Sequence, residues 1–350
     1  MHPSYGWGVC VEACYTKGMT RHASAGVNLG GWLVVEKWIT PSLFTGMRAS
    51  NEYELVKKPE GKKRLRRHHD TFITEADLDW LKAHGITLVR VPFGHWIFGD
   101  QPPYIGAIDR LDWLVRTAGE KGIEVLLDLH GAPGAQNAYA HSGSGNRPRD
   151  RRWLEDRHAQ QRTIELLVRI AERYREAGNV WGIQLLNEPD PGRTGLRLAW
   201  FYRRAYRAVS RVARPGTRIV FSDGYAPLLL VNALGLARRR THPVLMDCHF
   251  YQCFGAADKR RTFNGQLRKL RRTERLIRFL VVFQPVIVGE WSAMLPYAVG
   301  SEKTWRYWHR QEAAYDKAEA LFYWNYKTEP PGRWNFRAMI EGRRTAERGQ

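Results

Sequence analysis

The chain has 350 residues, of which 43% are hydrophobic, and its 55 Lys and Arg against 35 Asp and Glu give a net charge of +20 at pH 7. This length and apolar content exclude a disordered chain and allow one large core. The basic residues form clusters spread over the whole sequence without the aromatic motifs of RNA-binding modules, so we expect no specific nucleic-acid partner.

The first 25 residues contain no continuous apolar stretch, and no segment approaches the ~20 apolar residues of a membrane span. We expect residues 1–25 to be a peripheral extension of one domain at residues 26–350. We also expect a cytoplasmic location, with secretion as the alternative if the true start differs. The four cysteines show no metal-ligand spacing. We therefore expect no metal, no cofactor and a monomer.

Strands and helices are expected to alternate along the chain. The eight strand candidates are residues 26–35, 86–93, 123–129, 180–189, 218–222, 244–251, 286–291 and 320–326. Helices are expected at residues 74–85, 109–121, 156–177, 196–213, 264–279, 302–317 and 336–344. Residues 40–69 are expected to be an irregular excursion, and residues 132–152 a long functional loop.

This alternation fits either a doubly wound sheet or a closed barrel, and the number of strands favours the barrel. The chain lacks the Gly-rich turn of a dinucleotide-binding fold and the P-loop of a nucleotide-binding fold. We therefore expect an α/β protein made of a single (β/α)8 TIM barrel. Its active site should lie at the C-terminal ends of the strands.

Polar side chains stand where the expected strands end. The run VWGIQLLNEP at residues 180–189 is apolar nearly throughout, as is typical of a parallel strand covered on both faces, and it stops in Asn187 and Glu188. A second strand, VIVGEW, stops in Glu290. The other strand-end residues are Arg90, His130, His249, Tyr251 and Trp324. In a barrel these positions converge on one face, although each one alone is more often a structural hydrogen-bonding residue.

Two carboxylates in one pocket can cleave a glycosidic bond when one is protonated and the other is ionised. We expect Glu290 to be the nucleophile, kept ionised by Arg90 and by a hydrogen bond from Tyr251. Glu188 is expected to be the acid, with its pKa raised by the nearby charge of Glu290.

The remaining strand-end residues suit a sugar ring. Asn187 is expected to hold the 2-hydroxyl, and Trp324 to lie under the ring. His130 and His249 could bind a metal in another setting, but they lack a carboxylate-rich ligand set once both glutamates are assigned to catalysis.

Five motifs occur together at these strand ends. They are RVPFG at residues 90–94, DLHG at 128–131, LLNEP at 185–189, HFYQCF at 249–254 and GEWSA at 289–293. Together they resemble glycoside hydrolase family 5, in clan A of the retaining (β/α)8 glycosidases. More narrowly, GVNLGGWLVVEKWITPSLF and DLHGAPGAQNAYAHSG resemble the exo-β-1,3-glucanase (glucan 1,3-β-glucosidase) branch. The resemblance extends from about Gly26 over nearly the whole chain.

The resemblance implies that Glu188 is the acid/base and Glu290 the nucleophile. It implies a surrounding −1 subsite made of Arg90, His130, Asn187, His249, Tyr251 and Trp324. Glu36 matches a carboxylate that binds the non-reducing glucose. Tyr139 and Phe254 match a pair of aromatic residues that clamp the next glucose.

The chain departs from this branch at Ala140-His141, where the branch typically has Asp-Asn. That Asp closes the end of the pocket and forms hydrogen bonds there. The exo mode and the preference for glucose therefore stay open, and we expect His141 to compensate in part.

From these features we expect a retaining β-glucoside hydrolase that acts on β-1,3-glucan or its oligosaccharides from the non-reducing end, through a glycosyl-enzyme. Alternatives within the family are endo-acting hydrolysis of β-1,4- or β-1,6-glucan and hydrolysis of glucosylated lipids or small glucosides. An alternative from another class is a catalytically silent barrel that binds glycans or polyanions. The intact Glu188 and Glu290 argue against it.

Overall fold

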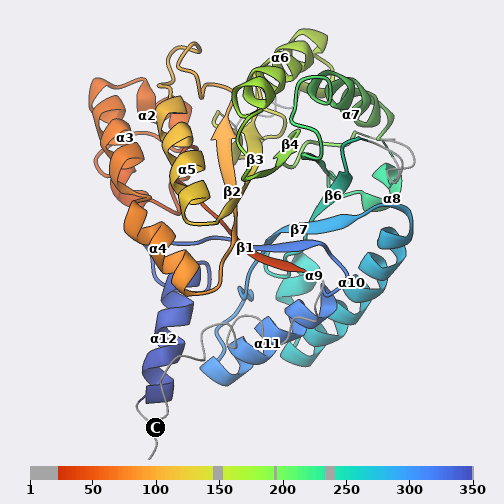
Figure 1. The fold of residues 1–350 in the computed structure, drawn as a ribbon. Helices are drawn as coiled ribbons and strands as arrows, with labels where there is room; N and C mark the ends of the chain where they lie inside the picture. The colour runs from red at the N-terminus through yellow and green to blue at the C-terminus, as the bar shows by residue number, and fades with distance from the viewer. Residues whose placement is uncertain (1–22, 145–152, 193–194, 232, 234–240, 349–350) are drawn as a thin grey trace, which may run out of the picture.

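The computed structural model describes residues 23–144, 153–192, 195–231, 233 and 241–348. Figure 1 shows a central barrel surrounded by helices. The strands are β1 (Ser24–Asn28), β2 (Leu88–Gly94), β3 (Glu124–Gly131), β4 (Val180–Gln184), β5 (Arg218–Ser222), β6 (Val244–His249), β7 (Val286–Trp291) and β8 (Ala320–Tyr323). Each strand pairs with its neighbours in sequence, and β1 pairs in parallel with β8, so the barrel is closed. The expected (β/α)8 barrel is confirmed.

Helices follow the strands in the expected places. They are α2 (Glu52–Val56), α3 (Pro59–Thr71), α4 (Glu75–Ala83), α5 (Ile108–Glu120), α6 (Arg157–Arg173), α7 (Leu196–Val209), α8 (Pro227–Leu230), α9 (Ala256–Lys259), α10 (Phe263–Phe283), α11 (Ser301–Ala314) and α12 (Phe336–Arg348). Two 3-10 helices, η1 (Pro41–Phe44) and η2 (Ala140–Ser142), lie in loops. The sequence did not predict the four-residue helices α8 and α9. None of the described helices combines the length and the apolarity needed to cross a bilayer.

Residues 40–69, expected to be irregular, are largely helical, and this expectation was wrong. Asn51 caps α2 by accepting a hydrogen bond from the backbone of Glu54. Pro59 stands in the first turn of α3, where its missing N–H costs nothing. Leu65 is fully buried, so α3 has an apolar contact under its charged surface. The Lys and Arg residues that suggested a loop form the solvent face of this helix.

The first strand is shorter than expected, and it ends at Asn28 instead of extending to residue 35. Gly31 has a φ of 71°, a left-handed conformation that ends the extended segment. Residues 1–22 lie outside the described part of the chain, so the expectation of a peripheral extension stays a prediction.

The interior of the barrel is layered. An apolar layer consists of Leu88, Leu126, Trp181, Val220, Leu245, Ile287, Ala320 and Phe322. Arg90, Asp128 and Asp247 follow the apolar residues of their own strands by two positions. Because alternate residues of a strand point to the same side, these charged residues form the next layer toward the C-terminal end. The apolar layer therefore supports a polar one, which in turn supports the site.

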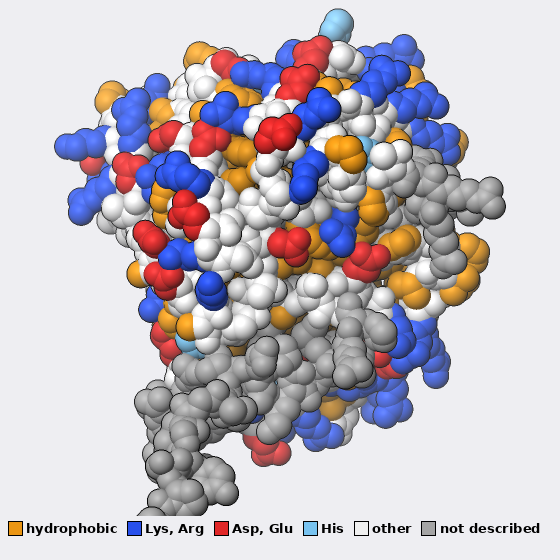
Figure 2. All heavy atoms as spheres, viewed as in Figure 1, with side chains coloured by type: hydrophobic (Ala, Val, Ile, Leu, Met, Phe, Trp, Pro, Cys, Tyr) orange, Lys and Arg blue, Asp and Glu red, His pale blue; other side chains and the backbone are white. Residues whose placement is uncertain are grey.

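The outer surface carries the high net charge. Lys and Arg side chains are spread over the face visible in Figure 2, with acidic side chains among them. This distribution agrees with the absence of a single basic stripe on that face.

Candidate active site

A cavity of about 810 Å³ opens at the C-terminal ends of the strands. It is lined by Glu36, Trp38, His130, Tyr139, Ala140, His141, Glu188, Tyr225, His249, Tyr251, Phe254, Glu290, Trp324 and Trp334. Ten of the twelve residues predicted for the site are in this set. The other two, Arg90 and Asn187, are fully buried behind the cavity wall.

Two buried carboxylates face each other in this cavity. Glu188 follows β4 and is 6% exposed, and Glu290 lies near the end of β7 and is 5% exposed. One carboxylate oxygen of each, together with a ring nitrogen of His249, lie within 4.8 Å of one another. Residues that are 102 positions apart in sequence thus meet in one acidic pair.

The backbone of Glu188 is held in an unusual conformation. Its φ is 42°, which a residue with a side chain rarely adopts. Gln136 donates its amide to the carbonyl of Asn187 at 2.9 Å, and Asn137 donates to the carbonyl of Glu188 at 2.9 Å. The loop after β3 therefore aims the Glu188 side chain into the cavity. No sequence pattern indicated these two amide contacts.

Arg90 is the centre of the polar layer beneath the carboxylates. Its Nη1 donates to Glu290 Oε1 at 3.2 Å, and its Nη2 donates to Asn187 Oδ1 at 2.7 Å. Nη2 also lies 3.1 Å from Asp128 Oδ2. Because the guanidinium is fully buried and does not line the cavity, it acts on the site through Glu290 and Asn187.

Two side chains hold Glu290, and Asp247 holds the backbone just before it. The Tyr251 hydroxyl donates to Oε2 at 2.9 Å, opposite the Arg90 contact with Oε1. The backbone N–H of Gly289 donates to Asp247 Oδ1 at 2.7 Å. A Cβ at position 289 would lie only 2.2 Å from that oxygen, so the close approach requires glycine.

Glu188 has different partners. His249 Nδ1 lies 2.6 Å from Glu188 Oε1, while His249 Nε2 lies 3.0 Å from Asp247 Oδ2. The Tyr225 hydroxyl also forms a hydrogen bond with the Glu188 carboxylate. On the other side, His141 Nε2 lies 3.4 Å from Glu188 Oε2. The carboxylate is therefore flanked by two imidazoles.

The amide of Asn137 determines which proton His141 carries. Its Oδ1 accepts from the backbone of Tyr139 at 3.0 Å, and its Nδ2 donates to the carbonyl of Glu188, so the orientation of the amide is fixed. Nδ2 also lies 2.9 Å from His141 Nε2, which must then be the acceptor. Burial lowers the pKa of His141 to about 4, in agreement with a neutral ring. The lone pair of His141 Nε2 therefore faces Asn137, whose amide also holds the carbonyl of Glu188.

His249 affects the pKa of both glutamates. Burial opposes an imidazolium, but the carboxylates of Glu290 and Asp247 raise the pKa of His249 well above its usual value. Burial would also raise the pKa of Glu188, yet the hydrogen bond and charge of His249 lower it. Burial raises the pKa of Glu290 to about 7, because the attraction of His249 does not offset it and the charge of Glu188 adds to it.

These directions are opposite to the sequence-based expectation, in which Glu290 was kept ionised and the pKa of Glu188 was raised. That expectation rested on Arg90, Tyr251 and the mutual repulsion of the two glutamates. The sequence did not show that His249 Nδ1 lies 2.6 Å from Glu188 but 3.6 Å from Glu290.

Glu36 and Trp38 line one end of the cavity. Trp38 Nε1 donates to Glu36 Oε2 at 2.9 Å. Burial raises the pKa of Glu36 to about 8, although the Trp38 hydrogen bond lowers it. The neighbouring wall holds Trp324, whose ring stacks on His130 with centroids 5.6 Å apart. This end offers hydrogen-bonding groups beside flat aromatic faces, as a sugar ring requires.

The rim of the cavity is aromatic and exposed. Tyr139 and Tyr225 are each 57% exposed and Phe254 is 65% exposed, although all three line the cavity. Phe254 stacks on Trp334, with ring centroids 6.0 Å apart. Sequence reasoning missed Trp38, Tyr225 and Trp334, because they stand in loops without a strand pattern. The one available signal was the position of Trp38 two residues after Glu36.

Glu188, His249 and Glu290 form a possible cation site among the described residues, judged by the closeness of their donor atoms. Both nitrogens of His249 are already engaged by carboxylates. A metal would have to displace the proton that His249 Nδ1 shares with Glu188. The donor set therefore fits proton transfer better than metal ligation.

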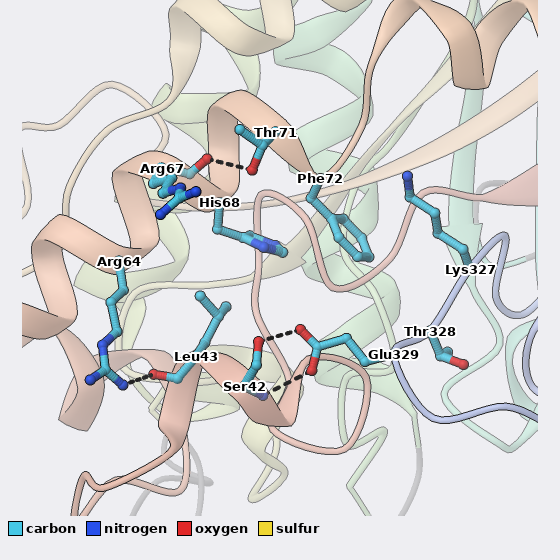
Figure 3. A pocket seen from close by; sticks show the side chains of 10 residues that line it. All are labelled: Ser42, Leu43, Arg64, Arg67, His68, Thr71, Phe72, Lys327, Thr328 and Glu329. Carbon is cyan, nitrogen blue, oxygen red and sulfur yellow. Dashed lines mark hydrogen bonds between the residues drawn. The ribbon is translucent and has the colours of Figure 1, made fainter.

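A second cavity, of about 470 Å³, lies between η1, α3 and the loop after β8 (Figure 3). Glu329 accepts hydrogen bonds from the backbone N–H and the hydroxyl of Ser42, and Arg64 donates to the carbonyl of Leu43. The acidic group of this cavity is thus already bonded to the protein. The cavity contains no pair of carboxylates and is not a candidate active site.

Comparison with known proteins identifies the family. The sequence profile described as Cellulase (glycosyl hydrolase family 5) matches residues 53–329. The probable glucan 1,3-beta-glucosidase A of Aspergillus niger is 36% identical over 281 residues, which cover 77% of this chain and 65% of that protein. The glucan 1,3-beta-glucosidase of Kluyveromyces lactis is 28% identical, and the match covers 90% of this chain and 86% of that protein. The chain thus spans about two thirds of the length of the Aspergillus relative.

Solved structures share the fold. The rutinosidase of Aspergillus niger superposes with a TM-score of 0.79 at 20% identity, covering 92% of this chain and 97% of that one. Endo-glycoceramidase II of a Rhodococcus species superposes with a TM-score of 0.58 at 17% identity, covering 90% of this chain and 74% of that one. At these identities the likeness concerns the fold alone.

Proposed function

The chain belongs to glycosyl hydrolase family 5, and from this premise we propose that it hydrolyses β-glucosidic bonds with retention, acting on β-1,3-glucan or its oligosaccharides from the non-reducing end. The observation that carries the proposal is the buried pair Glu188 and Glu290 at the strand ends, with carboxylate oxygens within 4.8 Å of each other. The names of the fungal relatives support the choice of linkage.

The spacing of the pair supports retention. An inverting enzyme needs about 6.5–9.5 Å between its carboxyl groups, because a water molecule must fit beside the sugar. One oxygen of Glu188 and one of Glu290 lie within 4.8 Å of each other, closer than that separation. Direct attack by one carboxylate is then the accessible route.

In the first step Glu290 attacks the anomeric carbon. The bond from this carbon to the leaving oxygen breaks as the bond to a Glu290 oxygen forms, and Glu188 gives its proton to the leaving oxygen. The proton comes from the hydrogen bond between Glu188 Oε1 and His249 Nδ1. When it moves onto Glu188, His249 becomes neutral and the carboxylate charge that repelled ionised Glu290 is removed.

In the second step water replaces the protein on the sugar. Glu188, now ionised, takes a proton from the water as its oxygen attacks the anomeric carbon, and Glu290 leaves as a carboxylate. Arg90 Nη1 and the Tyr251 hydroxyl then stabilise the returning charge, each from a separate oxygen. The glucose leaves with the configuration it had in the substrate.

The lining of the cavity is compatible with exo action. Glu36 and Trp38 offer a carboxyl group and an indole that can hold the terminal glucose. Tyr139 and Phe254 are exposed at the rim, where they can contact the next glucose. His141 occupies the wall where this branch of the family typically has Asn, and it turns its ring nitrogen toward Glu188. We infer that His141 positions the acid/base residue.

A second substrate class is favoured by the rim. Tyr225, which bonds to Glu188, is 57% exposed and Phe254 is 65% exposed, so both present apolar faces at the mouth of the cavity. An apolar leaving group, as in small glucosides or glucosylated lipids, can lie against these faces. If this class is preferred, kcat/KM for an alkyl glucoside should exceed that for laminaribiose.

The test of the proposed reaction combines product and intermediate. During hydrolysis of laminarin oligosaccharides, NMR should record β-glucose as the first product, before mutarotation. An activated 2-deoxy-2-fluoro-β-glucoside should label one peptide, the one containing Glu290. First release of α-glucose, or labelling elsewhere, would contradict the mechanism. Release of longer products without glucose would contradict exo action.

A further inference from the structure

Helix α10 carries an unusual solvent face. Its inward face is formed by Leu270, Ile277 and Leu280, all fully buried against the barrel. Its outward residues recur at intervals of three and four, which is one face of a helix. These exposed residues are Arg268, Arg271, Arg272, Arg275, Arg278, Phe279, Val282 and Phe283.

The amino-terminal part of this face is strongly basic. Among the described residues, no carboxylate forms an ion pair with Arg268, Arg271, Arg272 or Arg275. The nearby acidic residue Glu274 is already bound, by Arg310 at 2.6 Å and by Arg278 at 3.3 Å. Four exposed guanidinium groups thus share one surface without compensation.

The carboxyl-terminal turn of the same face is apolar. Phe279 is 49% exposed, Val282 is 62% exposed and Phe283 is 46% exposed. The two phenylalanine rings contact each other, with centroids 5.1 Å apart. A cluster of exposed apolar side chains beside a basic patch is typical of a surface that binds another molecule or a membrane.

We propose that this face of α10 binds the surface of an anionic lipid bilayer. The four arginines contact the acidic headgroups, and Phe279, Val282 and Phe283 enter the boundary between headgroups and acyl chains. A bilayer satisfies both halves of the face at once. A nucleic acid would use the arginines but leave the apolar turn exposed, and a second copy would bring like charges together.

The proposal is compatible with an open active site. α10 runs back along the barrel from the loop after β6 to the start of β7 (Figure 1). Phe283 therefore lies near Val286, where β7 begins, whereas Glu290 lies near the end of that strand. The apolar turn and the cavity are at opposite ends of the barrel. A docked molecule would thus present its cavity to the medium, and the inference does not depend on the proposed reaction.

Co-sedimentation with vesicles tests this surface. The full chain should sediment with equimolar phosphatidylcholine and phosphatidylglycerol but not with phosphatidylcholine alone, and added salt should release it. Replacing Arg268, Arg271, Arg272 and Arg275 together by Gln should weaken the binding at least about 100-fold, given roughly one factor of five per basic residue near the surface. Phe279→Ser with Phe283→Ser should weaken it about tenfold or more.

Matched controls separate the surface from total charge. Replacing Arg66 and Arg67 on α3, Arg207 on α7 and Arg211 in the turn after α7 by Gln removes the same number of positive charges, and it should weaken binding far less. Leu228→Ser with Leu229→Ser is the control for apolar exposure. The proposal is overturned if anionic vesicles do not bind the chain, or if the control set weakens binding as much as the α10 set. It is also overturned if RNA binds through the four arginines of α10 while vesicles do not.

Discussion

The floor of the cavity and its rim are built in different ways. The floor consists of strand residues. Arg90, Asp247 and Glu290 lie on β2, β6 and β7, and they are bonded to one another or to common partners. All three are at most 5% exposed. The rim stands on loops, and Tyr139, Tyr225 and Phe254 are more than half exposed.

This difference separates the chemistry from the choice of substrate. Floor residues are held within the polar layer, so a change at one of them disturbs the charges of several others. Rim residues can change without breaking that network. We therefore expect substitutions in the floor to affect every substrate, and substitutions in the rim to affect substrates unequally.

The largest expected effect is at Glu290. Glu290→Ala removes the nucleophile and should lower kcat by about 10⁴-fold or more for every glucoside. Azide should restore turnover of an activated aryl glucoside and give the α-glucosyl azide, because it attacks from the vacated face. The melting temperature should not fall. Activity close to that of the unaltered protein would remove Glu290 from the mechanism.

Arg90 tests whether the floor acts as one unit. Arg90→Ala leaves three buried carboxylates without their countercharge and should cost about 3–5 kcal/mol of unfolding free energy. The kinetic role of Arg90 is better measured with Arg90→Lys, which keeps the positive charge but loses the planar guanidinium and its paired N–H donors. We expect its kcat to fall about 100-fold on all substrates alike. A loss confined to oligosaccharides would contradict the distinction between floor and rim.

The pH dependence should report the charge on Glu290. Its pKa is raised to about 7, and the nucleophile must be ionised, so kcat/KM should fall about tenfold per pH unit below that value. Glu188→Gln removes one cause of the raised pKa. An activated aryl glucoside does not need a general acid to protonate its leaving group. With this substrate, the acidic limb of the kcat/KM profile should then move to lower pH. An acid limb near the ordinary value of 4.5 in the unaltered protein would contradict this arrangement.

The smallest expected effect lies at the rim. Tyr139→Ala or Phe254→Ala should lower kcat/KM for laminari-oligosaccharides about tenfold, the equivalent of one lost aromatic contact. Hydrolysis of an aryl glucoside, which lacks the second sugar, should change by less than about threefold. Equal losses on both substrates would mean that these aromatic residues do not contact the second sugar. Both variants should fold normally, because the replaced side chains are exposed.

Local patterns along the chain predicted most of the fold. The apolar runs of β4 and β7 identified buried parallel strands, and Thr74 forms the predicted cap at the start of α4. Prediction failed at residues 40–69, where charges on one face of α3 hid the buried Leu65. A charged run is read as a loop when its few apolar positions are too sparse to reveal a period.

The sequence by itself determined the barrel and the set of polar residues at its strand ends, because a strand's period of two and the order of its residues are local properties. Only the tertiary structure decided the depth of those residues, and it put Arg90 and Asn187 behind the wall. It also decided that His249 lies closer to Glu188 than to Glu290, and His249 therefore lowers the pKa of Glu188. Distances between residues from different strands depend on how the barrel closes, and no single segment carries that information.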